Sequence, residues 1–249
     1  MMFSIEIECD REDQEMLVAE LWEHGSAGIV ELTPCRVRAF FEDTIDPNAL
    51  LQLYPGATRR REEERDWVQS ARELMQPMKV GSRFFLVPEW RNDPAPEGRF
   101  RITVNPGMAF GTGVHETTRL CLEAMEEYLK PGMSVLDVGT GSGILTRAAR
   151  MLGASRTIAC DTDPIAVEIA GEGFVGSADA VASASTDLVV ANINAETIIH
   201  LAKDLKRVVR TGGVLLLSGF EVNEAESVCH QMAGKLVTKG DWAMVAVRI

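Results

Sequence analysis

A glycine-rich segment with an acidic residue in front of it is the clearest chemical signal in this sequence. The segment reads V-L-D-V-G-T-G-S-G over residues 135–143, where an apolar stretch predicts a strand that leads into a turn. Gly139 and Gly141 let the backbone approach a ligand closely, because glycine has no Cβ atom. A dinucleotide fingerprint would need a glycine in place of Ile144, so the order is instead Asp-x-Gly-x-Gly-x-Gly, starting at Asp137. We assign Asp137, Gly139 and Gly141 to a cofactor site.

A second acidic residue, Asp161, follows the next predicted strand, 22 positions after Gly139. A carboxylate there can accept hydrogen bonds from both ribose hydroxyls of a nucleoside ligand. Ligands of doubly wound sheets bind at the carboxyl ends of the strands, where Gly139 and Asp161 are expected to lie. The alternative is a structural glycine turn beside a solvated Asp161.

The residues after position 100 predict alternating strands and helices. Repeated βα units imply an α/β fold with a mostly parallel, doubly wound sheet that is covered by helices on both faces. A terminal hairpin adds one antiparallel strand at or near the edge. The expected strands are Ser134–Val138, Arg156–Cys160, Asp187–Asn192, Val214–Ser218, Leu236–Thr238 and Trp242–Val247.

The N-terminal part of the chain predicts a separate, smaller α+β domain. Residues 1–66 are expected to form strand, helix, two strands, helix and strand, which is the order of a ferredoxin-like β-α-β-β-α-β unit. Residues 67–99 are expected to hold a linker helix and a connection. Within them, Asn92–Gly98 has two prolines and the composition of a linker, so we place the domain boundary there. Residues 100–249 then form the second domain.

Charge and composition narrow the partners and the setting. The net charge of the 249 residues is −12. Proteins that hold nucleic acid through phosphates usually carry a basic face, so we expect no direct nucleic-acid partner. Residues 1–46 contain twelve Asp and Glu but three Arg. This acidic lobe either steers a basic partner or only keeps the protein soluble. No apolar run is long enough to span a membrane, and the N-terminus does not resemble a signal peptide, so we expect a cytoplasmic protein without a membrane partner.

The cysteines and histidines indicate neither a disulfide framework nor a metal site. The five cysteines are widely scattered and contain no C-x-x-C pair, and the four histidines form no cluster with metal-ligand spacing. Each cysteine is therefore expected to act as a small core residue.

Upstream of the glycine turn, residues 105–118 read N-P-G-M-A-F-G-T-G-V-H-E-T-T. This segment resembles the D-P-G-x-A-F-G-T-G-x-H-x-T-T motif of the bacterial methyltransferases that modify large-subunit ribosomal protein eleven. The resemblance covers most of the chain and is weakest before residue 60. It continues through the segments 66–90, 189–193, 212–219 and 242–248.

The resemblance implies a Rossmann-like class I methyltransferase domain with S-adenosylmethionine as cofactor. The family's cofactor contacts fall on Thr118, Gly139, Asp161 and Asn192. The Asn192 carbonyl is further expected to accept a hydrogen bond from the substrate amine, or Asn192 is a structural strand end. Thr118 alternatively caps a helix.

Two other residues near the glycine turn carry open assignments. Phe110 either walls the methionine moiety of the cofactor or belongs to the core. His115 either lines the substrate entrance or braces the glycine loop.

Several positions depart from the family pattern. Asn105 replaces a usual Asp, Glu116 a usual Pro, and Ala71 a frequent Trp. The stretch between residues 163 and 187 is shorter than usual, so its helix and third strand are expected to be trimmed. Asp179 within it is a candidate contact for the adenine amine.

The resemblance implies methylation of lysine or N-terminal amines of ribosomal protein eleven, a basic protein. The enzyme must present a neutral amine in line with the methyl–sulfur bond, and the cofactor carries the activated methyl. Two alternatives stay open: the same chemistry on another protein or a small molecule, and a non-catalytic module that binds the cofactor.

Overall fold

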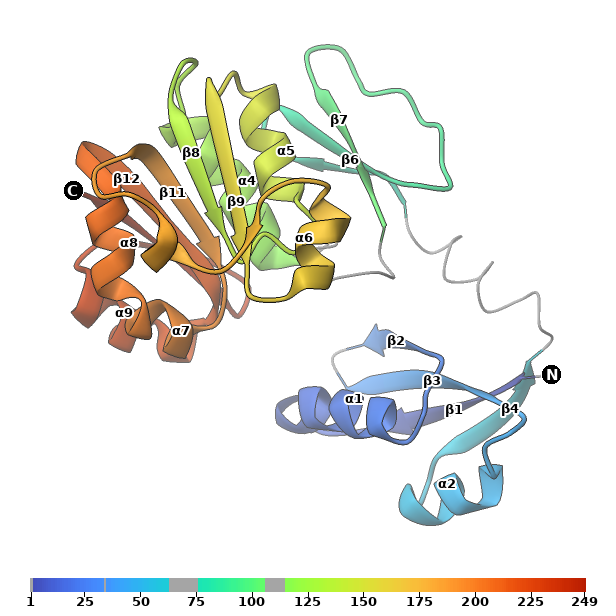
Figure 1. Cartoon of the computed structure of the whole chain (residues 1–249). Helices are drawn as coiled ribbons and strands as arrows, with labels where there is room; N and C mark the ends of the chain where they lie inside the picture. Colours follow the sequence, from blue (N-terminus) through green and yellow to red (C-terminus); the bar gives the residue numbers. More distant parts are fainter. Residues whose placement is uncertain (1, 34, 63–75, 106–114) are drawn as a thin grey trace. The chain divides into compact units, whose positions relative to one another are not determined.

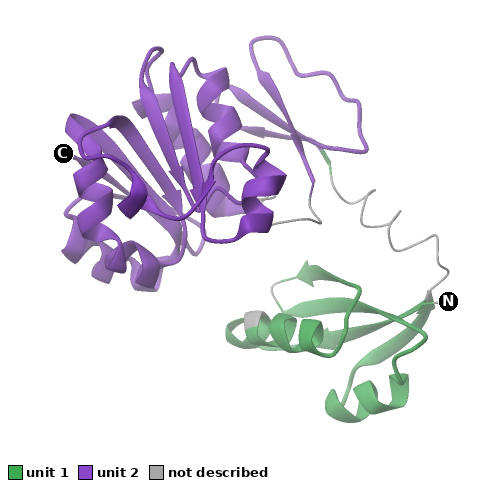
Figure 2. Ribbon diagram, viewed as in Figure 1, with its two compact units in different colours: residues 1–76 green, residues 77–249 purple. Residues whose placement is uncertain are grey.

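The computed structural model describes residues 2–33, 35–62, 76–105 and 115–249. The chain forms two units, Met1–Gln76 and Pro77–Ile249, and each is described by itself (Figure 2). The expected linker helix at residues 67–75 lies outside the described residues.

The first unit is a four-stranded sheet with two helices against one face (Figure 1). Its strand order is β2-β3-β1-β4, and every neighbouring pair is antiparallel, as in a β-α-β-β-α-β unit. Alternate residues of β1, such as Phe3 and Ile5, are buried against Leu21 and Leu50 from the helices. The elements are β1 (Met2–Glu8), η1 (Arg11–Asp13), α1 (Gln14–Glu23), β2 (Gly28–Thr33), β3 (Arg36–Glu42), α2 (Pro47–Leu53) and β4 (Thr58–Glu62).

The second unit begins with a small three-stranded sheet: β5 (Met78–Val80), β6 (Phe84–Pro88) and β7 (Phe100–Val104). Because β6 and β7 pair in parallel, the proline-containing segment Asn92–Gly98 is the loop between them and lies inside this unit. Arg101 holds the loop, since its guanidinium donates to the backbone carbonyls of Asp93 and Arg91. The boundary between the units therefore falls near residue 76 and not at this segment.

A seven-stranded sheet forms the centre of the second unit, in the order β10-β9-β8-β11-β12-β14-β13. The first five strands are parallel, and β14 is antiparallel to both of its neighbours, as predicted for the terminal hairpin. The strands are β8 (Ser134–Val138), β9 (Arg156–Asp161), β10 (Phe174–Val175), β11 (Thr186–Asn192), β12 (Val209–Glu221), β13 (Lys235–Lys239) and β14 (Trp242–Arg248).

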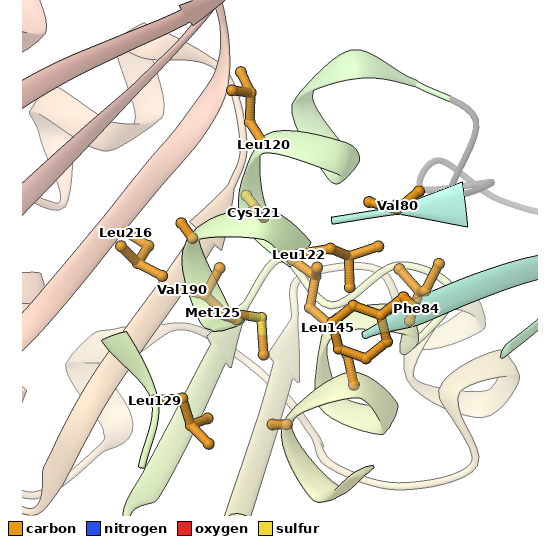
Figure 3. Close-up of a cluster of buried hydrophobic side chains, with 14 of the residues drawn as sticks. Val80, Phe84, Leu120, Cys121, Leu122, Met125, Leu129, Leu145, Val190 and Leu216 are labelled. Carbon is orange, nitrogen blue, oxygen red and sulfur yellow. The ribbon is translucent and has the colours of Figure 1, made fainter. Parts of the chain in front are cut away.

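Helices cover both faces of this sheet, which explains why its central strands are continuously apolar. α4, α5 and the small sheet bury one face, and Figure 3 shows side chains from α4, β5, β6, α5, β11 and β12 meeting there. α7, α8 and α9 bury the other face. The helices are α4 (Glu116–Tyr128), α5 (Ile144–Met151), α6 (Pro164–Ala170), α7 (Ala195–His200), α8 (Ala202–Val208) and α9 (Ala225–Met232).

The helix and strand between residues 163 and 187 are short: α6 has seven residues and β10 has two. Asp163 caps α6 by accepting a hydrogen bond from the N–H of Ile165, and Pro164 occupies the first turn. Among the described helices, none is long and apolar enough to cross a membrane.

Candidate functional site

The parallel registers bring three strand ends together at the carboxyl edge of the central sheet. On β8, Val138 lies opposite Cys160 of β9 and Ala191 of β11. The residue that follows each of these three is therefore placed in one row, across the point where the strand order reverses between β8 and β11. Doubly wound sheets bind their ligands at this point. The row consists of Asp161, Gly139 and Asn192.

The turn after β8 needs glycine at position 139. The φ angle of Gly139 is +72°, and a Cβ atom there would lie 2.3 Å from Cγ2 of Ile193. The N–H of Gly139 donates to the carbonyl of Cys160 at 2.9 Å, which holds the turn against β9. Any other side chain would have to move either Ile193 or the turn, so the close approach of the backbone depends on this glycine.

Asp161 joins the glycine turn to the start of α6. Its Oδ2 accepts from the N–H of Gly141 at 3.0 Å, and its Oδ1 accepts from the N–H of Asp163 at 3.0 Å. Each carboxylate oxygen can accept more than one hydrogen bond, so both can also receive a ribose hydroxyl. The carboxylate is half-buried at the edge of the sheet, where a ligand can reach it.

Asp137 is buried beneath the turn and fastens it to α5. Its Oδ2 accepts hydrogen bonds from the hydroxyls of Thr140 and Thr146, at 2.9 and 2.8 Å, and from the N–H of Thr146 at 3.1 Å. Its Oδ1 is buried and accepts no hydrogen bond from the described residues. Burial raises the pKa of Asp137 to about 6, against the hydrogen bonds to Thr146 and Thr140, which lower it. These contacts support a role in positioning the turn, and a direct cofactor contact stays a prediction.

Asn192 and Thr118 form the polar contact between β11 and α4. The side-chain amide of Asn192 donates from Nδ2 to the hydroxyl oxygen of Thr118 at 3.3 Å. Thr118 is fully buried, and the Oδ1 of Asn192 is buried without a hydrogen-bond donor among the described residues. An unpaired buried acceptor is costly, so this oxygen is suited to a donor that arrives with a ligand.

His115 caps α4, which removes the helix-cap interpretation of Thr118. The Nδ1 of His115 accepts from the N–H of Thr117 and lies 2.7 Å from its hydroxyl oxygen. The imidazole also packs edge-on against Trp242, with ring centroids 4.4 Å apart. Trp242 pairs with Glu221, the last residue of β12. Glu221 lies three residues after Ser218, which pairs with Asn192. His115 therefore connects α4 to the terminal hairpin beside the site, and its role at the substrate entrance stays a prediction.

No group of three or more His, Cys, Asp or Glu side chains is placed to hold a metal ion within the described ranges. The polar groups gathered at the carboxyl edge are instead a ribose-type acceptor, a glycine turn and an unpaired amide oxygen.

Comparison with known proteins agrees with this arrangement. The family model described as ribosomal protein L11 methyltransferase (PrmA) matches residues 42–248. The chain belongs to the ribosomal protein L11 methyltransferase family. Its sequence is 41% identical to that of the family member from Symbiobacterium thermophilum over 180 residues, which cover 68% of this chain and 59% of that protein. It is 40% identical to the member from Cupriavidus necator over 215 residues, which cover 80% of this chain and 71% of that protein.

A solved structure supports the same family. The crystal structure of ribosomal protein L11 methylase from Lactobacillus delbrueckii subsp. bulgaricus aligns with a TM-score of 0.63 and 28% identity, covering 69% of this chain and 97% of that chain. The predicted Rossmann-like class I methyltransferase fold is confirmed by this likeness and by the mostly parallel sheet. The chain spans less than two thirds of the length of the Symbiobacterium family member.

Two of the residues expected to act in this family are not placed at the site by the structure. Phe110 lies outside the described residues. Asp179 is exposed in η2 (Ala178–Ala180), where its backbone carbonyl accepts from Arg207, and its contact with adenine stays a prediction.

Three residues near the family's expected cofactor contacts were given no role from the sequence. Ile165 and Val175 are 63% and 57% exposed. Val175 pairs directly with Asp161, and Ile165 lies in the first turn of α6, which Asp161 contacts through the N–H of Asp163. They offer apolar surface beside the ribose-type acceptor. Trp242 meets His115 from the far end of the chain. Of these three residues, only Ile165 had a local sequence signal, because it is an apolar residue just after the Asp-Pro start of α6. The positions of Val175 and Trp242 depend on the tertiary fold.

Proposed function

We propose that this chain transfers methyl groups from S-adenosylmethionine to lysine or N-terminal amines of ribosomal protein L11. Membership of the family supports the reaction and the substrate. The structural observation that carries the proposal is the Oδ1 of Asn192, which is buried and has no donor among the described residues. Asn192 lies in one row with Gly139 and Asp161.

The residues present fit the cofactor along this row. Asp161 would hold the ribose through its two oxygens, and Gly139 and Gly141 would let the backbone lie against the ligand. Exposed Ile165 and Val175 would flank the adenine. When bound, S-adenosylmethionine supplies a methyl group on a positively charged sulfur, which is the electrophile of the reaction.

Asn192 would orient the substrate amine. Its Nδ2 is held by Thr118, so its Oδ1 is the atom presented to an N–H donor. A neutral amine that donates one N–H to this oxygen can direct its lone pair at the methyl carbon. This alignment would let the amine take up the methyl group that the cofactor supplies. A free lysine has a pKa of about 10.4, and transfer into a partly buried site next to a positive sulfur favours the neutral form.

Unit 1 would recruit the substrate. The charge of residues 1–46, with twelve Asp and Glu against three Arg, complements a basic ribosomal protein. The same acidic balance argues against direct nucleic-acid binding. A ribosomal substrate places the reaction in the cytoplasm, away from membranes.

Mass spectrometry of ribosomal protein L11 from a strain that lacks the gene tests this proposal. We expect L11 to lose its methyl groups and to regain them when the wild-type chain is supplied. Asn192→Ala, supplied at an equal level, should restore them far more slowly. Unchanged methylation in the deletion strain would assign the chain to another acceptor. Restoration of L11 methylation by Asn192→Ala at the wild-type rate would exclude the proposed role of Asn192 but would keep L11 as the substrate.

A further inference from the structure

Cys9 and Cys35, which are 26 positions apart in the sequence, lie next to each other at the end of the β1–β3 pair in unit 1. β1 and β3 pair antiparallel, and the last registered pair is Glu8 with Arg36. Cys9 directly follows β1 and Cys35 directly precedes β3, and the N–H of Cys9 donates to the carbonyl of Cys35 at 3.0 Å. The two cysteines therefore lie opposite each other just past the last registered pair.

The two side chains are directed to the same face of the sheet. Directly opposed residues of an antiparallel pair point the same way, and alternate residues share a face. Ile7 and Val37 precede and follow the cysteines by two positions on this face, and both are buried in the core against α1. Cys9 packs against the same core and is half-buried, whereas Cys35 is exposed.

The spacing of this pair suits a covalent bond between the sulfurs. Opposed Cα atoms of an antiparallel pair are about 4.5–5.5 Å apart. Disulfides span Cα separations of about 4.4–6.8 Å. We propose that Cys9 and Cys35 are a reversible dithiol–disulfide pair that is oxidised by thiol exchange with small-molecule disulfides of the glutathione class.

Cys35 is more exposed than Cys9, so Cys35 is the first of the two to react with the small-molecule disulfide. The accessible Cys35 thiolate attacks the small-molecule disulfide, a mixed disulfide forms at its sulfur, and one thiolate leaves. The Cys9 thiolate then attacks the Cys35 sulfur, and the second small thiolate leaves. The two cysteines are oxidised, the disulfide reagent is reduced to two thiols, and the two cysteine protons end on them.

The surroundings of Cys9 agree with its role in the second step. Burial raises the pKa of Cys9, and Cys35, Asp13 and Asp10 raise it further in that order. Cys9 is therefore a thiol in the reduced state and a poor first nucleophile. Conversion of Cys35 to the mixed disulfide places a leaving group opposite Cys9.

The remaining cysteines are unsuited to this chemistry. Cys121 and Cys160 are buried in the second unit, where burial raises the pKa of the Cys160 thiol to about 12. Cys229 is half-buried in α9 and has no cysteine neighbour on its short helix. It therefore serves as a control for exposure alone.

Oxidation of the full chain with oxidised glutathione tests the proposal. The reduced protein is incubated with the reagent, denatured and alkylated, and cysteine peptides are identified by mass spectrometry. We expect a Cys9–Cys35 linked peptide and loss of alkylation at both positions, with reversal by dithiothreitol. Cys229→Ser should give the same result.

Two single variants separate the steps. Cys9→Ser should accumulate a glutathione adduct at Cys35, because the second thiol is missing, and Cys9→Ala serves the same purpose if the serine destabilises the unit. Cys35→Ser should leave Cys9 free. A stable adduct at Cys35 in the wild-type chain, or full alkylation of both cysteines after oxidation, would overturn the proposal.

Discussion

Asn192 uses one of its two polar atoms in the fold, and the other is the atom that we propose binds the substrate. The amide nitrogen holds Thr118 of α4, and the amide oxygen is buried without a donor among the described residues. The family resemblance alone assigned this residue to the reacting amine. The structure adds a physical reason for this proposal, because the Thr118 contact holds the amide nitrogen and leaves the oxygen for a donor.

Asn192→Ala is expected to lower turnover more than cofactor affinity. The hydrogen bond to the amine is lost, and the amine nitrogen becomes positively charged as it is methylated. Hydrogen bonds with one charged partner contribute about 1.5–3 kcal/mol, or roughly 10- to 100-fold in rate. Asn192→Asp should move the activity optimum to higher pH, because a carboxylate stabilises the protonated amine and raises its pKa.

Steady-state kinetics across pH, together with calorimetry of cofactor binding, measure these effects. Asn194→Ala is the matched control, since Asn194 caps α7 by accepting from the N–H of Thr197 and should affect stability alone. Wild-type kinetics in both Asn192 variants would make this residue a structural strand end.

Asp137 should make the stability of the sheet edge depend on pH. Its pKa is raised to about 6 by burial, from an ordinary value of 3.8, so the folded state holds the proton more tightly than the unfolded state. The stability contributed by this proton is complete below about pH 4 and is lost as pH rises through about 6. At about 1.4 kcal/mol per pH unit, the loss is on the order of 3 kcal/mol.

Asp137→Asn removes this titration. We therefore expect the unfolding free energy of the variant, relative to wild type, to increase by about 3 kcal/mol between pH 4 and pH 7. Hydrogen exchange of β8 peptides at a series of pH values measures the difference locally. Parallel pH profiles for the two proteins would show that the Asp137 carboxyl titrates normally.

At the scale of elements, alanine substitutions at two glycines test how closely the backbone packs in the turn between β8 and α5. Gly139 and Gly212 both have positive φ angles, +72° and +84°. A Cβ atom at position 139 would lie 2.3 Å from Ile193, whereas nothing lies within 4 Å of one at position 212. Gly212→Ala therefore measures the backbone strain alone, about 1–2 kcal/mol.

Gly139→Ala should cost more than Gly212→Ala in thermal stability and should also weaken cofactor binding, because the turn or Ile193 must move. Differential scanning fluorimetry and calorimetric titration with S-adenosylmethionine provide the two readouts. Equal stability losses with unchanged affinity in both variants would contradict the close approach at the turn.

The element order after residue 100 was predictable because each signal is local. Caps, prolines and apolar runs delimit α6, β8 and β11, and the antiparallel β14 follows from a short hairpin. Once the strands are parallel, the row of Asp161, Gly139 and Asn192 follows from their common position at strand ends.

Other features depend on pairing between distant segments and were not predictable. Asn92–Gly98 has the composition of a linker, but the pairing of β6 with β7 makes it a loop. The contacts between His115 and Trp242, and between Cys9 and Cys35, also join residues that are far apart in the sequence. The burial of Asp137 beneath the turn was also not predictable, because the motif does not show which way its side chain points.

At the scale of the whole molecule, the acidic charge is concentrated on one unit. η1 and α1 expose Glu12 and Glu23 on unit 1. If this surface recruits a basic substrate, Glu12→Lys with Glu23→Lys should raise KM for L11 several-fold and leave kcat unchanged, because the charges act on encounter and not on the reacting atoms.

Glu196→Lys with Glu226→Lys, which makes the same charge change at exposed positions of unit 2, is the matched control. The KM effect should weaken as salt is added, whereas cofactor affinity should not change between the variants. An equal KM for the two double variants would assign the acidic lobe to solubility.

Methyl transfer to purified ribosomal protein L11 tests the central claim most directly. The chain is incubated with L11 and S-adenosylmethionine, and intact L11 is followed by mass spectrometry with the modified amines located in peptides. We predict stepwise addition of methyl groups to lysine or N-terminal amines by the wild-type chain, and a rate roughly 10- to 100-fold lower for Asn192→Ala. Unmodified L11 after incubation with a chain that binds S-adenosylmethionine would contradict the account.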